Sequence, residues 1–142
     1  MKFFLTLSKK HLAIILAAII IALIILGQFV TAKGSKINGS TNALRVQYIK
    51  SLKLEPDDSN VTSKEIIIPE NFSKVYKEYN TLQKKAGFDL SRHRGEKATV
   101  YTYALSGSDK LIHIIVSDGK IIGGDIADIS FNGEMKPLCT VG

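Results

Sequence analysis

The longest apolar stretch of the chain lies near its N-terminus and contains no charged side chain between Lys10 and Lys33. Leucine, isoleucine and alanine would lie on every face of a helix formed there, whereas a surface helix keeps one polar face. A helix of about 22 residues is about 33 Å long, enough to cross a hydrocarbon core of about 30 Å. We therefore expect a transmembrane signal-anchor, in contact with the lipid bilayer, at residues 12–32.

A cleaved secretory signal is the alternative for this segment, because lysines precede it and Val30, Thr31 and Ala32 resemble a cleavage site. Cleavage after Ala32 would release the rest of the chain as a secreted factor. The anchor is favoured because the apolar stretch exceeds the apolar region of about 7–15 residues that typifies a signal peptide. Lysines stay on the cytoplasmic side of a membrane, so we expect residues 1–11 inside the cell and the domain outside it.

Beyond a polar tether at residues 33–42, apolar positions recur at four-residue steps and predict a helix over residues 43–53. Its N-cap is expected among three adjacent polar residues, Ser40, Thr41 and Asn42. Residues 55–63 are acidic and rich in turn-forming side chains, which predicts a turn.

A short strand is predicted at residues 65–68, where three isoleucines precede Pro69. Pro69 suits the first turn of the next helix. The apolar positions from Phe72 to Ala86 share one face of a 3.6-residue period, which predicts an amphipathic helix. Gly87 can adopt the left-handed conformation that ends such a helix.

The remaining pattern is typical of strands. Alternation and β-branched residues predict three of them, at residues 98–105, 111–116 and 120–126. Asp118-Gly119 has the composition of a two-residue hairpin turn, and Gly123-Gly124 indicates a bulge or a close backbone approach. The C-terminal residues are expected to pack loosely, with a turn at Asn132-Gly133.

The predicted order is helix, strand, helix and then three strands that form a meander. Amphipathic helices bury their apolar sides when they pack on a sheet. We therefore predict an extracytoplasmic α+β domain at residues 43–142, with two helices on one face of a mainly antiparallel sheet of about four strands.

Composition and charge exclude few classes of function. Three of the 19 basic residues precede the apolar segment, and the other 16 against 13 acidic residues leave a charge of +3. Nucleic-acid binders carry denser basic surfaces, so we expect no nucleic-acid partner. Cys139 is the single cysteine and lies far from the apolar segment, which excludes an internal disulfide and the usual lipoprotein attachment.

Several short motifs together resemble a family of small Firmicutes proteins. They are Glu65-Ile66-Ile67-Ile68-Pro69, Tyr79-Asn80, Gly87-Phe88-Asp89-Leu90, Tyr101-Thr102-Tyr103 and Ile121-Ile122-Gly123-Gly124-Asp125. Proteins of that family have an N-terminal membrane segment followed by a domain of unknown function. The resemblance implies a location and an architecture, and it transfers no activity, cofactor or catalytic residue.

Four residues are candidates for binding: Tyr101, Tyr103, His93 and Asp125. The two tyrosines fall on one face of their strand because side chains alternate, and tyrosines on an open face are typical of a contact surface. Histidine near carboxylates such as Asp89 is typical of general-base or metal chemistry. The sequence offers no nucleophile beside them and no full set of metal ligands.

We therefore expect a non-enzymatic, single-pass protein of the cell membrane. Its domain is expected to bind a ligand or a protein partner of the bacterial cell envelope, with no cofactor and no metal. An envelope enzyme or metal-dependent hydrolase that uses Asp89, His93 and Asp125 is the alternative, and a secreted factor is a third hypothesis.

Overall fold

The structure is a computed structural model that describes residues 9–31, 36–130 and 133–139. The chain divides into two compact units, Met1–Gly34 and Ser35–Gly142. The first unit contains helix α1 (Lys9–Thr31), which includes residues 12–31 of the predicted apolar segment, and Ala32 lies outside the described residues. Within the described residues, no helix meets the length and apolarity that crossing a membrane requires.

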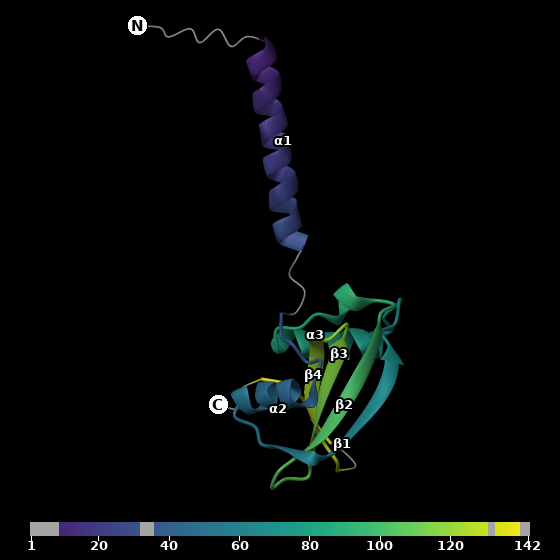
Figure 1. Cartoon of the computed structure of the whole chain (residues 1–142). Coiled ribbons are helices and arrows are strands. Elements are labelled where there is room, and N and C mark those ends of the chain that lie inside the picture. Colours follow the sequence, from purple (N-terminus) through teal and green to yellow (C-terminus); the bar gives the residue numbers. More distant parts are fainter. Residues whose placement is uncertain (1–8, 32–35, 131–132, 140–142) are drawn as a thin grey trace, which may run out of the picture. The chain divides into compact units, whose positions relative to one another are not determined.

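The second unit is built on an antiparallel sheet (Figure 1). Its five strands lie side by side in sequence order: β1 (Pro56–Ile67), β2 (Lys97–Leu105), β3 (Lys110–Ser117), β4 (Lys120–Asp128) and β5 (Met135–Pro137). Every neighbouring pair is antiparallel. The α+β class and the antiparallel sheet are therefore confirmed, with five strands where about four were predicted.

Helix α2 (Asn42–Ser51) covers one face of the sheet. Val46 and Ile49 pack there in a cluster with buried side chains of β2, β3 and β4. Thr41, one of the three expected caps, accepts a hydrogen bond from the backbone N–H of Leu44. This bond satisfies one of the free amides at the start of the helix.

Helix α3 (Lys74–Lys85) covers the opposite face, together with the short 3₁₀ helix η1 (Leu90–His93). The prediction that both helices share one face is wrong. Ile114 and Ile115 are adjacent in β3, point to opposite faces and belong to different apolar clusters. Since β3 is apolar on both sides, each face of the sheet needs a helix to exclude water.

The predicted start of the second helix is also wrong, because α3 begins at Lys74 and not at Pro69. Ser73 is its N-cap and accepts a hydrogen bond from the backbone N–H of Tyr76. The predicted end is confirmed, since Gly87 has a φ of +85°. The hydrogen bond from the Phe88 N–H to the carbonyl oxygen five residues earlier completes the capping motif.

Strand β1 contains most of the segment for which a turn was predicted. Its register with β2 shifts between Asp57 and Thr62, so the residues between them bulge out of the ladder. Ser59 donates to the carboxylate of Asp57, which is the kind of local bond that turn-forming residues make. The turn chemistry is therefore real, but it lies inside a strand.

The β3–β4 hairpin was predicted correctly. Asp118 and Gly119 have φ values of 46° and 70°, as a two-residue turn with both central residues left-handed requires. The expected bulge lies in this hairpin, where the register shifts between Ile115 and Val116. A Cβ at Gly124 would collide with the backbone carbonyl of His113, so this glycine marks a close backbone approach.

Segments near both ends of the described part of the second unit pair with the sheet. Ile37 and Asn38, expected in the flexible tether, lie beside the start of β4, and Asn38 bridges to Lys120. The expected loose C-terminus is wrong as far as the structure describes it, because β5 pairs with β4 and Leu138 is buried. Of the expected turn, Gly133 donates to a nearby carbonyl, and Asn132 lies outside the described residues.

Candidate functional site: a groove on the uncovered part of the sheet

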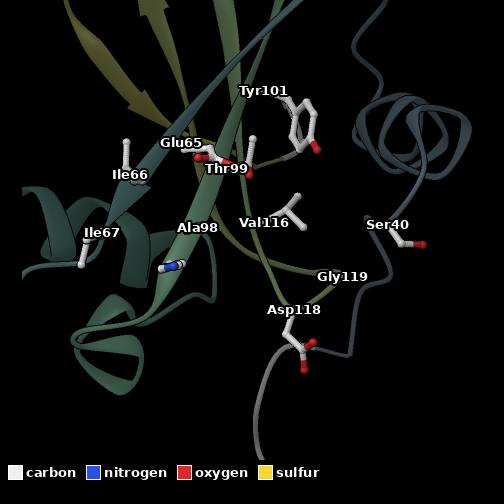
Figure 2. Close-up of a pocket in the computed structure, with 11 residues that line it drawn as sticks. Ser40, Glu65, Ile66, Ile67, Ala98, Thr99, Tyr101, Val116, Asp118 and Gly119 are labelled. Carbon is white, nitrogen blue, oxygen red and sulfur yellow. The ribbon is translucent and has the colours of Figure 1, made fainter.

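An open groove lies on the α2 face of the sheet, beyond the N-terminal end of that helix (Figure 2). Its volume is about 600 Å³. Strands β1 and β2 form the floor, and the β3–β4 turn and the loop before α2 form the sides. The lining side chains include Ser40, Glu65, Ile67, Lys97, Thr99, Tyr101 and Asp118.

The buried side chain of Arg45 positions Tyr101, which lines the groove. The Arg45 side chain of α2 is only 6% exposed, and its guanidinium lies 3.5 Å from the centre of the Tyr101 ring. Nε of Arg45 donates to the Tyr103 hydroxyl (2.9 Å), and Nη1 donates to the backbone carbonyl of Gly39 (2.8 Å). The Tyr103 hydroxyl in turn donates to Asn42 (2.8 Å). Arg45 thereby joins the helix, the loop before it and the sheet.

The two tyrosines of β2 therefore have different roles. Tyr103 is fully buried under α2, and this burial raises the pKa of its hydroxyl, although Arg45 offsets part of the effect. Tyr101 lies two residues earlier on the same face and lines the groove beside the helix. The prediction of a shared face is correct, and the end of α2 decides which ring stays accessible.

The open side of the groove combines an apolar side chain with separate charges. Ile67 is 65% exposed, which is unusual for an isoleucine in a sheet. Glu65, Lys97 and Asp118 line the groove, and among the described residues the structure shows no ion pair for any of them. These groups remain available to a ligand.

A second polar cluster lies on the α3 face and is centred on Asp125, which is 2% exposed. Oδ2 of Asp125 accepts a hydrogen bond from the Tyr79 hydroxyl (2.7 Å), and Oδ1 lies 2.8 Å from Nδ1 of His113. Burial and the adjacent carboxylate raise the pKa of Tyr79 well above its ordinary value. We refer to Tyr79, His113 and Asp125 as the Asp125 cluster.

The Asp125 cluster joins α3 to β3 and β4. A carboxylate that orients a histidine is one half of a general-base arrangement. Within the described residues, however, no serine, threonine or cysteine side chain is hydrogen-bonded to His113. Gln83 strengthens the same junction, since its Oε1 accepts from the backbone N–H of Gly124 (2.8 Å). The arrangement supports packing of the helix on the sheet.

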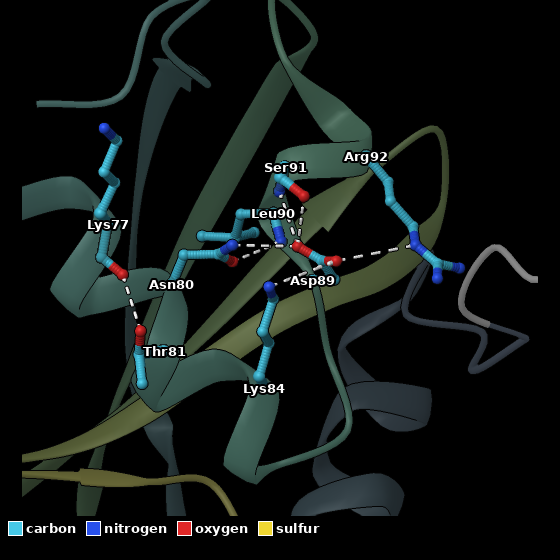
Figure 3. Close-up of polar contacts among 8 residues, drawn as sticks. All are labelled: Lys77, Asn80, Thr81, Lys84, Asp89, Leu90, Ser91 and Arg92. Carbon is cyan, nitrogen blue, oxygen red and sulfur yellow. Dashed lines mark hydrogen bonds and ion pairs between the residues drawn. The ribbon is translucent and has the colours of Figure 1, made fainter.

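Asp89 belongs to a third set of contacts, at the start of η1 (Figure 3). Its Oδ1 accepts from Asn80 Nδ2 (2.9 Å) and from both the backbone N–H and the hydroxyl of Ser91 (3.0 and 2.6 Å). Partial burial would raise its pKa, but these hydrogen bonds and the charge of Lys84 lower it to about 2. Asp89 is thus a helix cap that stays ionised.

His93 belongs to a fourth set of contacts, which includes neither Asp125 nor Asp89. Its Nδ1 lies 2.9 Å from a carboxylate oxygen of Glu96, and the same oxygen accepts from the Ser117 hydroxyl (2.9 Å). The structure therefore brings Tyr101 and Tyr103 together through Arg45, and leaves His93 and Asp125 in two other networks. Among the described residues, no group of three or more His, Cys, Asp or Glu side chains could hold a metal ion.

Sequence reasoning missed Arg45, which packs on the ring of Tyr101, and the charged groove residues Glu65 and Lys97. Arg45 lies on a short helix where an arginine is expected at the surface. Glu65 and Lys97 lie close to each other only through the β1–β2 pairing, in which Glu65 is opposite Thr99 and Ile67 is opposite Lys97. The sequence predicted strands at residues 65–68 and 98–105, but it did not predict that they pair.

The fold and the groove define a small α+β domain with an open groove on one face of its sheet. Residues 48–126 match the model of a family described as a domain of unknown function, DUF4830, and the chain belongs to this family. The match covers the sheet from β1 to most of β4, including every strand of the groove. No curated protein and no solved structure matches the chain.

Proposed function

We propose that the chain is a binding module of the bacterial cell envelope, held at the membrane by its N-terminal segment, and that its groove receives the partner. The observation that carries the proposal is the uncovered sheet surface with Tyr101, Ile67 and unpaired charges. Exposed apolar side chains beside polar ones are typical of surfaces that exclude water on binding.

Membrane attachment rests on the amino-acid sequence of the first unit. The stretch between Lys10 and Lys33 lacks charge, and helix α1 includes it up to Thr31. Exposed side chains of this helix include Ile14, Ile20 and Leu23. A bilayer would remove such side chains from water. Lysines before the segment favour a cytoplasmic N-terminus and a domain outside the cell.

The separation of Asp89, His93 and Asp125 supports a binding module over a hydrolase built on these three residues. Each carboxylate or imidazole is already engaged by a neighbour of its own: Ser91, Glu96 or His113. Concerted acid–base catalysis would need them within reach of one substrate atom.

Site-specific crosslinking tests the proposal. A photoreactive amino acid replaces Thr99 in the groove, in the full chain within its own membranes, and the matched control replaces Thr81 on the exposed side of α3. The proposal predicts one dominant adduct from position 99, weakened by Tyr101→Ala, and none of that mass from position 81. Equal adducts from both positions, or no adduct from position 99, would contradict it.

A further inference from the structure

Strand β1 forms an edge of the sheet. It pairs with β2 on one side, and within the described residues no strand pairs with its other side. Unpaired backbone groups at a sheet edge are a template for another strand, which is why many proteins cover or interrupt such edges. β1 has its bulge before Thr62, and from there to Ile67 its register with β2 is regular.

The register shows which amides of β1 face outward. Ile68 donates its N–H to Glu96 across the β1–β2 ladder, and inward bonds alternate along an antiparallel strand. The inward-facing residues are therefore Ile66, Lys64 and Thr62. The N–H and C=O groups of the residues between them, Ser63, Glu65 and Ile67, point to the open edge.

The same residues that face the edge with their backbones face the groove with their side chains. Glu65 and Ile67 line the groove, and Ser63 pairs with Tyr101 on that face. We infer that the groove and the β1 edge form one site, which binds an extended peptide segment of a partner protein as a sixth strand. The inference rests on the proposed binding function and names the kind of partner.

The charges of the site indicate the side chains of that segment. Two carboxylates, Glu65 and Asp118, and one cation, Lys97, line the groove. Ile67 lies two positions from Glu65 on the same face, so alternate residues of an added strand would meet them. The segment therefore carries a basic residue opposite Glu65 and a β-branched or other apolar residue opposite Ile67.

A second copy of the chain is a poorer occupant. Two β1 strands paired antiparallel about Glu65 would place the two carboxylates opposite each other, and like charges in that position destabilise a pair. A shift of the register by two residues places Glu65 opposite Ile67, which leaves the carboxylate without a cation. Charge complementarity therefore favours a basic peptide over self-association.

A display library of random peptides of about eight residues, the length of an ordinary strand, tests the inference against the full chain in detergent micelles. Three variants are compared with the unchanged chain. Glu65→Pro removes one outward N–H and keeps the inward bonds, Ile67→Lys removes the apolar contact, and Val75→Lys is the control because Val75 is 74% exposed on α3. Thermal unfolding of each variant verifies that it is folded.

The expected result is enrichment of peptides in which a basic residue and a β-branched or other apolar residue stand two positions apart. Their affinity should fall at least about tenfold in Glu65→Pro and Ile67→Lys and stay unchanged in Val75→Lys. Absence of enrichment, or peptides that bind all folded variants equally, would overturn the inference. The inference would also be overturned if sedimentation showed that the unchanged chain forms a dimer and the Glu65→Pro variant does not. That result would identify a second copy of the chain as the occupant. A groove-specific crosslink together with failed peptide binding would leave the proposed function standing without this site.

Discussion

At the scale of single residues, Asp125 shows how a buried charge is tolerated in this fold. It is almost fully buried, and each of its oxygens has a partner, the Tyr79 hydroxyl and the His113 ring. Loss of one partner would leave a buried carboxylate oxygen unsatisfied. We expect Tyr79→Phe to lower the free energy of unfolding by about 1–2 kcal/mol in denaturant titrations.

Tyr76→Phe is the matched control for Tyr79→Phe. Tyr76 lies on the same helix and packs edge-on against Tyr79, but among the described residues the structure shows no hydrogen bond of its hydroxyl. Its replacement should change the unfolding free energy by less than about 0.5 kcal/mol. Equal effects of the two substitutions would show that the Asp125 cluster does not stabilise the junction of α3 with the sheet.

Asp89 makes the free energy of unfolding depend on pH in the acidic range. Its hydrogen bonds and Lys84 outweigh partial burial and hold its pKa at about 2 in the folded protein, below the ordinary value of 3.8. The folded-state pKa is lower than the unfolded one, so the stabilisation is complete above about pH 4 and is lost as the pH falls toward 2. In denaturant titrations, Asp89→Asn should cost about 1 kcal/mol near pH 6, allowing for solvent screening.

The same substitution should cost much less near pH 2, because about half of the Asp89 carboxyl is then protonated in the folded protein and most of the ionic stabilisation is lost. Comparison of the two proteins at both pH values isolates Asp89 from other carboxylates whose pKa is lowered, such as Asp57 and Asp128. A difference that does not shrink in acid would contradict this role of Asp89.

Residue-level prediction succeeded where a local signal determines the role. Thr41 and Gly87 act through bonds to residues within five positions, so their capping roles were visible in the sequence. Arg45 and Asp125 act on partners far away in the chain, Tyr103 and Tyr79 respectively. Composition cannot reveal such pairs, because only the tertiary fold brings them together.

At the scale of elements, the β3–β4 hairpin has little tolerance for added atoms. A Cβ at Gly124 would meet the backbone carbonyl of His113, and the backbone cannot yield as a side chain can. Gly124→Ala should lower the unfolding free energy by about 2–3 kcal/mol, measured by denaturant titration. Gly107→Ala is the control, because a Cβ there meets nothing within 4 Å.

The control should cost about 1 kcal/mol, since Gly107 has a φ of +74° that disfavours alanine. A Gly124→Ala protein no less stable than Gly107→Ala would show that the strands separate easily at this point. A close backbone approach would then no longer explain the paired glycines of β4.

Elements, like residues, were predicted correctly where a local signal determines them and missed where distant parts of the chain determine them. β2, β3 and β4 follow one another through short turns, so their patterns and the Asp118-Gly119 signal predict them correctly. β1 and β5 depend on pairing to be strands, because one contains turn-forming residues and the other has only three residues. The sequence also could not predict which face of the sheet each helix covers, because both faces of β3 are apolar.

At the scale of the whole molecule, the single cysteine offers a test of orientation. Cys139 is exposed, so a membrane-impermeant maleimide should label it in intact cells if the domain lies outside. A Cys139→Ser protein that carries Ser8→Cys in the expected cytoplasmic tail should be labelled only after permeabilisation. The reverse pattern would contradict the proposed orientation, and recovery of labelled protein in the soluble fraction would contradict the anchor.

The central claim is that a partner occupies the groove and the β1 edge. Amide hydrogen exchange of the full chain tests it most directly, when membranes that retain their natural partners are compared with the purified protein in detergent. We predict slower exchange in the membranes at Ser63, Glu65 and Ile67, whose amides face the open edge, and equal exchange in α3. Equal rates at these β1 amides in both preparations, or slowing of the same size in α3, would contradict the claim.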